Sequence, residues 1–477
     1  MNDASPLRER SAAIATAAIP RTDVWRQVGD WLLLHQRAIK AGQWSVVAAY
    51  LVLVAVPAFL SLPDRFAHVW NNLTLFSQFV FWGIWWPFVL LSMVLVGRAW
   101  CGLFCPEGTL TEFASRHGRG RAIPRWIKWS GWPFTAFVCT TVYGQMISVY
   151  QYAGPALVIL GGSTLAAVLV GFSYGRGKRV WCRYLCPVSG VFGLLSKLSP
   201  LHFEVDAATW HASQQLPRQR FARINCAPLV PIRTMRGASA CHMCGRCSGF
   251  RGAVALARRS PNDEIVNVAG VAPNPWETAL IVVGMMGVAA GAFHWSVSPW
   301  FIAAKQATAE WLVHLDILWP LDATAPWWVL TNYPARNDVL TMLDGAILLA
   351  YIGLTAVVIG ALTCGFLALA TRALGRWSWV RFHHLAQSLI PIAGCGVFLG
   401  LSALTVTHLR GEGLHLEWVG LARAALLVAA SLWSMWLAIA IARRYVRSPV
   451  RRTLSALSVA GSVGVGNIGS VVLFWLW

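Results

Sequence analysis

Charged residues are scarce in this sequence, and acidic residues are scarcer than basic ones. Only 12% of the 477 residues are Asp, Glu, Lys or Arg, about half of the roughly 25% that soluble domains carry. This shortage excludes an ordinary soluble protein with a fully hydrated surface. The chain is instead 57% hydrophobic and holds 27 Trp, a composition typical of membrane proteins.

Long apolar runs account for the missing charge. A helix needs about 20 mainly apolar residues to cross the ~30 Å hydrocarbon core of a bilayer. Nine runs approach that length, at residues 44–62, 79–97, 132–150, 156–173, 276–294, 340–370, 385–408, 418–442 and 454–477. The sequence therefore predicts an all-α polytopic membrane protein with about nine transmembrane helices.

Basic residues outnumber acidic ones by 39 to 19, and their distribution explains the excess. On the span assignment above, 34 of the 39 Lys and Arg residues fall in the segments on one side of the membrane. The positive-inside rule places that side in the cytoplasm, together with the N-terminus and the cysteine-rich loops. The charge is thus read as a topology signal, and no nucleic-acid partner is expected.

Disulfides are not expected, although the chain has 11 Cys. Eight of them lie in loops assigned to the reducing cytoplasm, where metal binding or catalysis is the usual role. The first 43 residues carry scattered charges and no continuous apolar stretch, so no removable signal peptide is expected. The protein is expected in the cytoplasmic (inner) membrane of a bacterium.

The most specific motif is Cys241-His-Met-Cys244-Gly-Arg-Cys247. Cys-x2-Cys-x2-Cys supplies three of the four thiolates of a bacterial-type [4Fe–4S] ligand run. Structural zinc sites, the alternative, more often use two separated Cys-x2-Cys pairs. The spacing favours a cluster, in a small cytoplasmic ferredoxin-like iron–sulfur segment.

A second cysteine pattern occurs twice. Arg-x-Trp-Cys-x3-Cys-Pro begins at Arg98 and again at Arg179, each time directly after a predicted membrane hairpin. Such a recurrence indicates a parallel internal repeat. Residues four apart share a helix face, and neighbouring arginines favour thiolate over thiol.

If the two repeats pack symmetrically, their four thiols meet and form one cluster site. The residues concerned are Cys101, Cys105, Cys182 and Cys186. Two redox-active dithiols are the alternative, and purely structural cysteines a further one. Together with the cluster expected at Cys241–Cys247, this site gives a prediction of about two [4Fe–4S] clusters.

The ligand run at Cys241–Cys247 lacks a fourth cysteine where ferredoxins have one, since Arg251 occupies that position. Cys226, 15 residues before Cys241, is the nearest unassigned cytoplasmic thiol, and we predict that it completes the set. In the rival assignment a Cys-Pro thiol, Cys105 or Cys186, is lent to this cluster, as happens in two-cluster ferredoxins. His202 and His211 are further possible donors without a supporting pattern, and Arg246 and Arg251 would offset cluster charge.

Histidines near the span ends raise the possibility of a haem. The candidates are His294, His314, His383, His384, His408 and His415. Histidine is inexpensive at a span end or in a loop, so haem or metal ligation by these residues is the less favoured interpretation. Cys139, Cys364 and Cys395 lie in apolar runs and are expected to act as small hydrophobic residues.

Paired Cys-x3-Cys-Pro motifs after membrane hairpins, followed by a ferredoxin-type loop, resemble the membrane polyferredoxins of the NapH/NosR type. The resemblance covers about residues 44–260 and implies an integral [4Fe–4S] electron-transfer protein with Cys101, Cys105, Cys182 and Cys186 as signature cysteines. Members accompany periplasmic nitrate and nitrous-oxide reduction, and related proteins accompany bacterial ferrous-iron uptake. The resemblance thus implies a redox partner such as a periplasmic reductase or iron-transport subunits. This chain departs from the pattern in its single incomplete ferredoxin run and its extra spans after residue 276.

These observations predict four parts: a cytoplasmic tail (1–43), a two-hairpin membrane repeat (44–200), a cytoplasmic iron–sulfur segment (201–275) and a C-terminal membrane bundle (276–477). Within the tail, Trp25–Lys40 is expected as a helix on the membrane surface or in solvent. The leading hypothesis is electron transfer between a cytoplasmic or quinone donor and a membrane or periplasmic partner, by an electron-transfer component rather than a stand-alone enzyme. The alternatives are a transporter or iron-uptake accessory subunit with regulatory or structural clusters, and a redox sensor.

Overall fold

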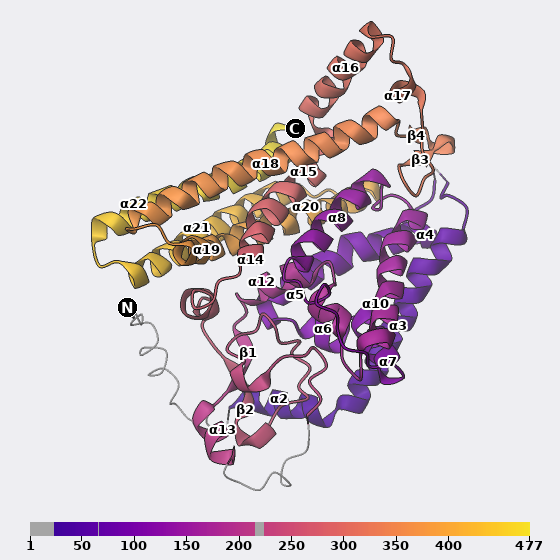
Figure 1. The fold of residues 1–477 in the computed structure, drawn as a ribbon. Helices are drawn as coiled ribbons and strands as arrows, with labels where there is room; N and C mark the ends of the chain where they lie inside the picture. The colour runs from indigo at the N-terminus through magenta and orange to yellow at the C-terminus, as the bar shows by residue number, and fades with distance from the viewer. Residues whose placement is uncertain (1–22, 65, 215–223) are drawn as a thin grey trace.

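The computed structural model describes residues 23–64, 66–214 and 224–477, and its described part is mainly helical (Figure 1). The first 22 residues of the expected N-terminal tail lie outside the described residues. Long helices fill most of the molecule, and a small mixed region with strands β1 and β2 lies at one end. The helix α16 and the short helix α17 lie at the opposite end.

Eight helices of the described residues are long and apolar enough to cross a membrane. They are Gln36–Phe59, Leu73–Val96, Ala153–Tyr174, Pro275–Val297, Met342–Ala373, Trp379–Gly411, Val419–Tyr445 and Pro449–Leu476. A helix satisfies all its backbone hydrogen bonds internally, which is why apolar runs in lipid adopt it. The expectation of an all-α polytopic membrane protein is confirmed.

The expected ninth span, 132–150, is not a full-length crossing helix. Its helix α8 (Trp132–Met146) has only 15 residues, because a turn beginning at Ile147 ends it inside the apolar run. The helix nevertheless runs beside the Pro275–Val297 span from end to end. Trp129 contacts Trp276 at one end, and Trp295 donates a hydrogen bond to Gln145 at the other (2.8 Å).

The first half of the chain consists of two hairpins, each followed by a short helix that carries a Cys-Pro motif. In the first, α3 (Gln36–Ala55) is followed by α4 (Leu73–Gln78), a π-helical stretch (Phe79–Trp85) and α5 (Trp86–Val96), then α6 (Ala99–Leu103) and α7 (Pro106–Arg116). In the second, α8 is followed by α9 (Ala153–Ala156), α10 (Gly162–Tyr174), α11 (Val180–Tyr184) and α12 (Ser189–Ser196). The helix α7 packs against α3 and α10, so the two hairpins interlock at the motif end.

The segment between the repeat and the later spans folds around a two-stranded antiparallel sheet. Strand β1 (Leu201–Val205) pairs with β2 (Val254–Arg258), with Leu201 opposite Arg258, and α13 (Ala207–Gln214) follows β1. The sheet, the cysteine loop between its strands and the helix α2 lie at the same end of the molecule (Figure 1). We call this end of the molecule the cysteine side.

The helix expected at Trp25–Lys40 is shorter than predicted and packs with one side on this sheet. Helix α2 (Val24–Leu34) ends before His35, and the first span begins already at Gln36. The helix α2 packs on β2, and Asp30 accepts a hydrogen bond from Ser248 (2.7 Å). Gly29 of this helix is buried, whereas Val24, Trp31 and Leu34 are exposed, so its place on a membrane surface stays a prediction.

The C-terminal bundle begins with α14 (Pro275–Ala279) and α15 (Ala289–His294), which bracket a π-helical stretch. On the far side follow α16 (Pro299–His314), α17 (Trp319–Asp322) and the short strands β3 (Asn332–Tyr333) and β4 (Asp338–Val339). The remaining helices are α18 (Met342–Ala373), α19 (Trp379–Ala386), α20 (Ile390–Gly411), α21 (Val419–Tyr445) and α22 (Pro449–Val471). An ion pair between the buried Lys197 and the partly exposed Glu277 (2.6 Å) joins the bundle to the repeat.

Candidate iron–sulfur centre

The two Cys-Pro motifs have the same local structure. Each begins at an arginine and forms a five-residue helix, α6 or α11, that holds the first cysteine. The amide of the second cysteine then bonds back to the tryptophan carbonyl, Cys105 to Trp100 (2.9 Å) and Cys186 to Trp181 (3.0 Å). Identical backbone hydrogen bonds in both copies support the internal repeat on structural grounds.

The spacing of four residues predicted that the paired cysteines share the face of one helix. In the structure they do not lie in one continuous helix. Cys101 lies in α6, whereas Cys105 is the N-cap of α7 and accepts a hydrogen bond from the Gly108 amide at its sulfur (3.4 Å). Pro106 begins the new helix, a position where a missing N–H costs nothing. The motif is therefore a helix–turn–helix corner that presents both thiols.

The structure brings the four motif cysteines together. Cys101, Cys105, Cys182 and Cys186 all line one cavity of about 700 Å³. Burial raises the pKa of the Cys182 thiol to about 12, offset in part by Arg179. Burial also raises the pKa of Cys105, and negative charge on Cys182 and Cys101 raises it further. Buried thiolates that lie close together repel one another. Such a group of cysteines is therefore stable only when the thiols are protonated or when they bind a cation such as an iron cluster.

The second set also converges. Burial raises the pKa of Cys247, and negative charge on Cys241, Cys244 and Cys226 raises it further. Cys226 belongs to this group despite its distance in sequence, and its carbonyl accepts a hydrogen bond from Lys178 (3.0 Å). The loop turns tightly at Met243 and Gly245, both with positive φ (53° and 73°), which allows three closely spaced cysteines to face one point.

The ferredoxin-type loop packs its backbone against the first Cys-Pro motif, next to Cys101. A Cβ built on Gly102 would lie 1.9 Å from the His242 carbonyl oxygen and 3.0 Å from the Cys244 amide nitrogen. Only a glycine next to Cys101 lets the ferredoxin-type loop approach so closely. In addition, Arg98 donates to the Ser239 carbonyl (3.0 Å), and Gln36 donates to the Cys244 carbonyl (3.0 Å).

Sequence reasoning missed Glu112, a buried carboxylate in α7 that connects both sets. It pairs with Arg179 (2.9 Å) from the second motif, Arg246 (2.9 Å) from the loop and Arg116 (2.9 Å) on its own helix. Burial alone would raise the pKa of Glu112, but Arg179 and Arg246 outweigh it and lower the pKa to about 2. Arg179 also donates to the Cys101 carbonyl (2.6 Å). An acidic residue six positions after a Cys-Pro motif gave no signal in the sequence, because its partners lie far along the chain.

The expected arginines have different roles. Arg246 reaches Glu112 beside both sets. Arg251 instead packs over the Trp210 ring (5.5 Å) and donates to the Ser213 carbonyl (3.2 Å). Of the two, Arg246 is the one placed to neutralise negative charge between the sites.

The histidines do not form a second cofactor site in the described part of the chain. His384 bonds to Tyr445 (2.7 Å) and to the Ile265 carbonyl (2.8 Å), and His383 to Thr278 (2.9 Å). His294 lines a separate small hollow, and His408 meets the edge of Phe79. No two of these histidines are opposed across the cysteine cavity, which gives the haem interpretation no support.

Both cysteine sets fit a cubane cluster by their chemistry. All 11 cysteines are free thiols, and each set contributes four soft donors, the number that a [4Fe–4S] cluster uses. Within the described residues, no group of three or more His, Cys, Asp or Glu side chains is arranged to hold a single metal ion. Buried thiols, neighbouring arginines and backbone amides directed at sulfur are the environment that such clusters require.

Comparisons with known proteins agree with this geometry. Residues 78–124 and 158–205 match the family model of a 4Fe-4S binding domain, and these stretches contain both Cys-Pro motifs. No solved structure matches the chain. These matches support a polytopic membrane protein that is similar to 4Fe–4S polyferredoxins.

Two curated relatives are similar over part of the chain. One is the putative electron transport protein YccM of Escherichia coli (strain K12), 25% identical over 222 residues, which are 42% of this chain and 61% of that protein. The other is the methylamine utilization ferredoxin-type protein MauN of Methylorubrum extorquens, 27% identical over 124 residues, or 23% and 42% of the two chains. The chain thus spans less than two thirds of the length of either relative.

Proposed function

We propose that this protein transfers electrons through two [4Fe–4S] clusters, between a cytoplasmic or quinone donor and a redox partner in or beyond the membrane. One cluster is held by Cys101, Cys105, Cys182 and Cys186, and the other by Cys226, Cys241, Cys244 and Cys247. The observation that carries the proposal is the close backbone packing of the ferredoxin-type loop on the first Cys-Pro motif at Gly102. Adjacent sites suit electron relay, whereas isolated structural clusters would need no such contact.

A [4Fe–4S] cluster, when bound, accepts and releases one electron at a time. The chain's own residues govern this exchange by charge and by exclusion of water. Arg179 is only 2% exposed and lies where negative charge on Cys105, Cys182 and Cys244 is felt. Positive charge beside a cluster favours its reduced, more negative state. Glu112 holds Arg179 and Arg246 in place and prevents an excess of positive charge.

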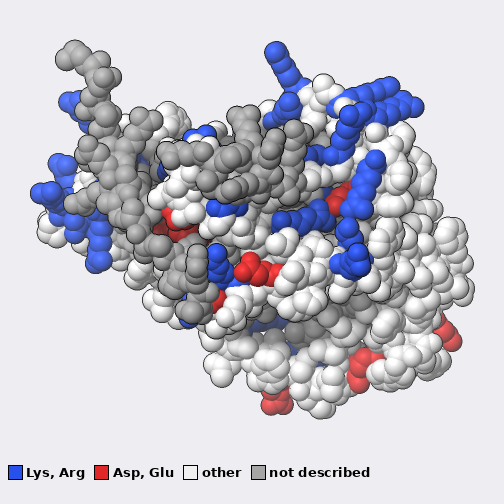
Figure 2. All heavy atoms as spheres, turned by 90° about the horizontal axis from the view of Figure 1, so that it is seen from below, with Lys and Arg blue, Asp and Glu red and all other residues white. Residues whose placement is uncertain are grey.

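We also propose that the cysteine side faces the cytoplasm of a bacterial inner membrane. Figure 2 shows this end of the molecule with many Lys and Arg and few acidic residues. The positive-inside rule assigns such an end to the cytoplasm. Reporter fusions test the orientation: alkaline phosphatase joined after Gly120 or Gly252 should be inactive, and activity there would reverse it. Trp477, at the end of the last span, should lie outside.

Metal analysis tests the function. The whole protein, purified anaerobically, should contain about eight iron and eight acid-labile sulfide ions per chain, since each of two clusters holds four of each. Dithionite should generate EPR signals of reduced clusters, broadened by mutual interaction. Redox-active dithiols, the rival for the first set, would give half that iron.

Two cysteine variants assign the ligands. Cys101→Ser and Cys226→Ser should each remove about half of the iron, from different clusters. Cys364→Ser, in a span away from both sets, is the matched control and should leave iron unchanged. Full iron in Cys101→Ser, and also in the further variant Cys186→Ser, would exclude the shared first site. Full iron in Cys226→Ser would mean that a Cys-Pro thiol is the fourth ligand of the second cluster.

A further inference from the structure

One side chain of the ferredoxin-type segment reaches the cavity that the motif cysteines line. His242, the residue after Cys241, belongs to the lining of this cavity, together with the cysteines of both Cys-Pro motifs. Among the described residues of 201–275, no other residue contributes to that lining. The ligand run of the second site therefore places a histidine at the first site.

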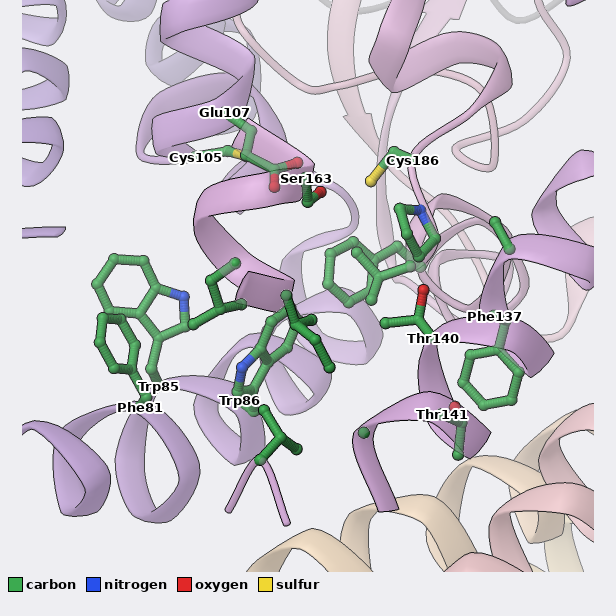
Figure 3. Close-up of a pocket in the computed structure, with 18 of the residues that line it drawn as sticks. Phe81, Trp85, Trp86, Cys105, Glu107, Phe137, Thr140, Thr141, Ser163 and Cys186 are labelled. Carbon is green, nitrogen blue, oxygen red and sulfur yellow. The ribbon is translucent and has the colours of Figure 1, made fainter. Parts of the chain in front are cut away.

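The backbone holds His242 at the cysteine end of the cavity. A Cβ built on Gly102 would overlap the His242 carbonyl oxygen, so the histidine lies directly against the first motif. Figure 3 shows Cys105 and Cys186 at the same end of the cavity, with Glu107 next to Cys105. A residue fixed against the first motif meets the cavity at this end, where the thiols are.

The ring of His242 is buried, and its nitrogens have no partner. The residue is 2% exposed, and neither ring nitrogen makes a hydrogen bond within the described part of the chain. Because Nδ1 has no accessible surface, the ring borders the cavity by the edge that carries Nε2. A buried polar group left unpaired costs about 1–3 kcal/mol, which a partner at Nε2 would offset.

Arginines near the ring decide which nitrogen carries its proton. The charges of Arg98, Arg179 and Arg183 act on His242, and burial beside positive charge keeps an imidazole neutral. A neutral imidazole has one N–H and one bare nitrogen, whereas an arginine side chain can only donate hydrogen bonds. The buried Nε of Arg98 still lacks an acceptor within the described residues. The bare nitrogen is therefore expected at Nδ1, which leaves the N–H on Nε2, at the edge that borders the cavity.

We propose that His242 donates a hydrogen bond from Nε2 to a sulfur of the first cluster, the one assigned to the four motif cysteines, and so raises the reduction potential of that cluster. The inference rests on the proposed electron-transfer function and gives the loop of the second site a part in tuning the first. Hydrogen bonds to sulfur are among the factors that set the potential of a [4Fe–4S] cluster. Ligation of iron by His242 is the alternative, but four thiols already line the cavity.

His202 provides a contrast within the same segment. It is also buried, and its Nδ1 also makes no hydrogen bond within the described residues. It lies in strand β1, however, and is not part of the cavity lining. The charges that act on it belong to Arg259, Glu264 and Asp263 rather than to the motif arginines. His202 is therefore a matched control, a buried histidine that cannot reach the first site.

A redox titration followed by EPR tests the proposal on the whole protein, purified anaerobically and held in lipid nanodiscs. The signal that is missing from Cys101→Ser identifies the first cluster. His242→Phe keeps a flat ring and removes the donor, so the ratio of reduced to oxidised first cluster at a fixed potential should fall about fivefold, because one hydrogen bond contributes about 1 kcal/mol. For one electron, this change corresponds to a potential lower by about 40 mV. His242→Gln retains an N–H and should restore at least half of the shift, and His202→Phe should leave both potentials unchanged.

Pulsed EPR on protein labelled with ¹⁵N-histidine provides a readout that a purely structural role would not give. The reduced first cluster of the wild type should show a weak coupling to one imidazole nitrogen, which His242→Phe lacks and His202→Phe retains. The wild-type measurement needs no substitution, so it decides the question even where His242→Phe fails to assemble its clusters.

Three results would overturn the inference. They are an absent nitrogen coupling in the wild type, unchanged potentials in His242→Phe at full iron content, and a coupling strong enough to show nitrogen bound directly to iron. Each of these leaves the electron-transfer proposal intact, because the clusters are present. A wild-type preparation without iron would contradict the proposed function instead.

Discussion

The two Cys-Pro motifs share a backbone but differ in the residues around it. Counted from the first cysteine, Gly102 in the first copy corresponds to Arg183 in the second, and Glu112 corresponds to Gly193. The ferredoxin-type loop docks on the copy with the glycine, where its backbone can reach. The carboxylate of that same copy binds Arg179 of the other copy. The duplicated motif thus supplies four equivalent thiols. Gly102 and Glu112, which occur only in the first copy, determine where the ferredoxin-type loop packs against it.

The largest effect is expected when the unique carboxylate of the first copy is removed. Glu112→Ala leaves Arg179 buried without its partner, which should cost about 3–5 kcal/mol of unfolding free energy. Arg116→Ala, its control, removes a half-exposed partner of the same carboxylate and should cost less than 1 kcal/mol. Thermal unfolding in nanodiscs measures both, and similar losses would show that Glu112 does not organise the site.

Protonation of Glu112 at low pH should lower the thermal stability of the protein. The pKa of Glu112 is about 2 in the folded protein against 4.5 ordinarily. A lowered folded pKa adds stability that is present above the unfolded value and lost as pH falls towards the folded value. The melting temperature should therefore decline from pH 5 to pH 2 more steeply in the wild type than in Glu112→Gln. Equal slopes would assign the acid sensitivity to other groups.

The glycine of the first copy should have an intermediate effect. Gly102→Ala puts a methyl group against the His242 carbonyl, and relief of that overlap should cost about 1–3 kcal/mol. The two cysteine sets should move apart, so the EPR broadening between reduced clusters should weaken while iron content is retained. Unchanged broadening would mean that the loop docks without this contact.

The smallest effect is expected at the matching position of the second copy. Arg183→Ala should change stability by no more than about 0.5 kcal/mol, because the side chain is partly exposed. A loss as large as that of Gly102→Ala would remove the asymmetry between the two copies. The same melting experiment measures it.

The sequence predicted what depends on local spacing. Cysteine spacing and the repeat predict both thiol sets, and the apolar runs contain the eight long spans. The helix in the expected ninth span is shorter than predicted, because hydropathy does not register the turn at Ile147. The contact of α2 with β2 could not be predicted, because Asp30 and Ser248 lie 218 positions apart in the sequence. The role of Glu112 and the cavity lined by the motif cysteines could not be predicted, since each depends on residues more than 60 positions apart.

The packing of α2 on β2 has a consequence for biosynthesis. The hydrogen bond between Asp30 and Ser248 joins residues 218 positions apart. At about 5–20 residues per second, translation would leave α2 without its partner strand for roughly 10–40 s. During that interval the first hairpins can enter the membrane, whereas the Cys241–Cys247 loop has not yet been made. The helix α2 can therefore pack against β2 and the ferredoxin-type loop only after the cysteines of the loop have emerged from the ribosome.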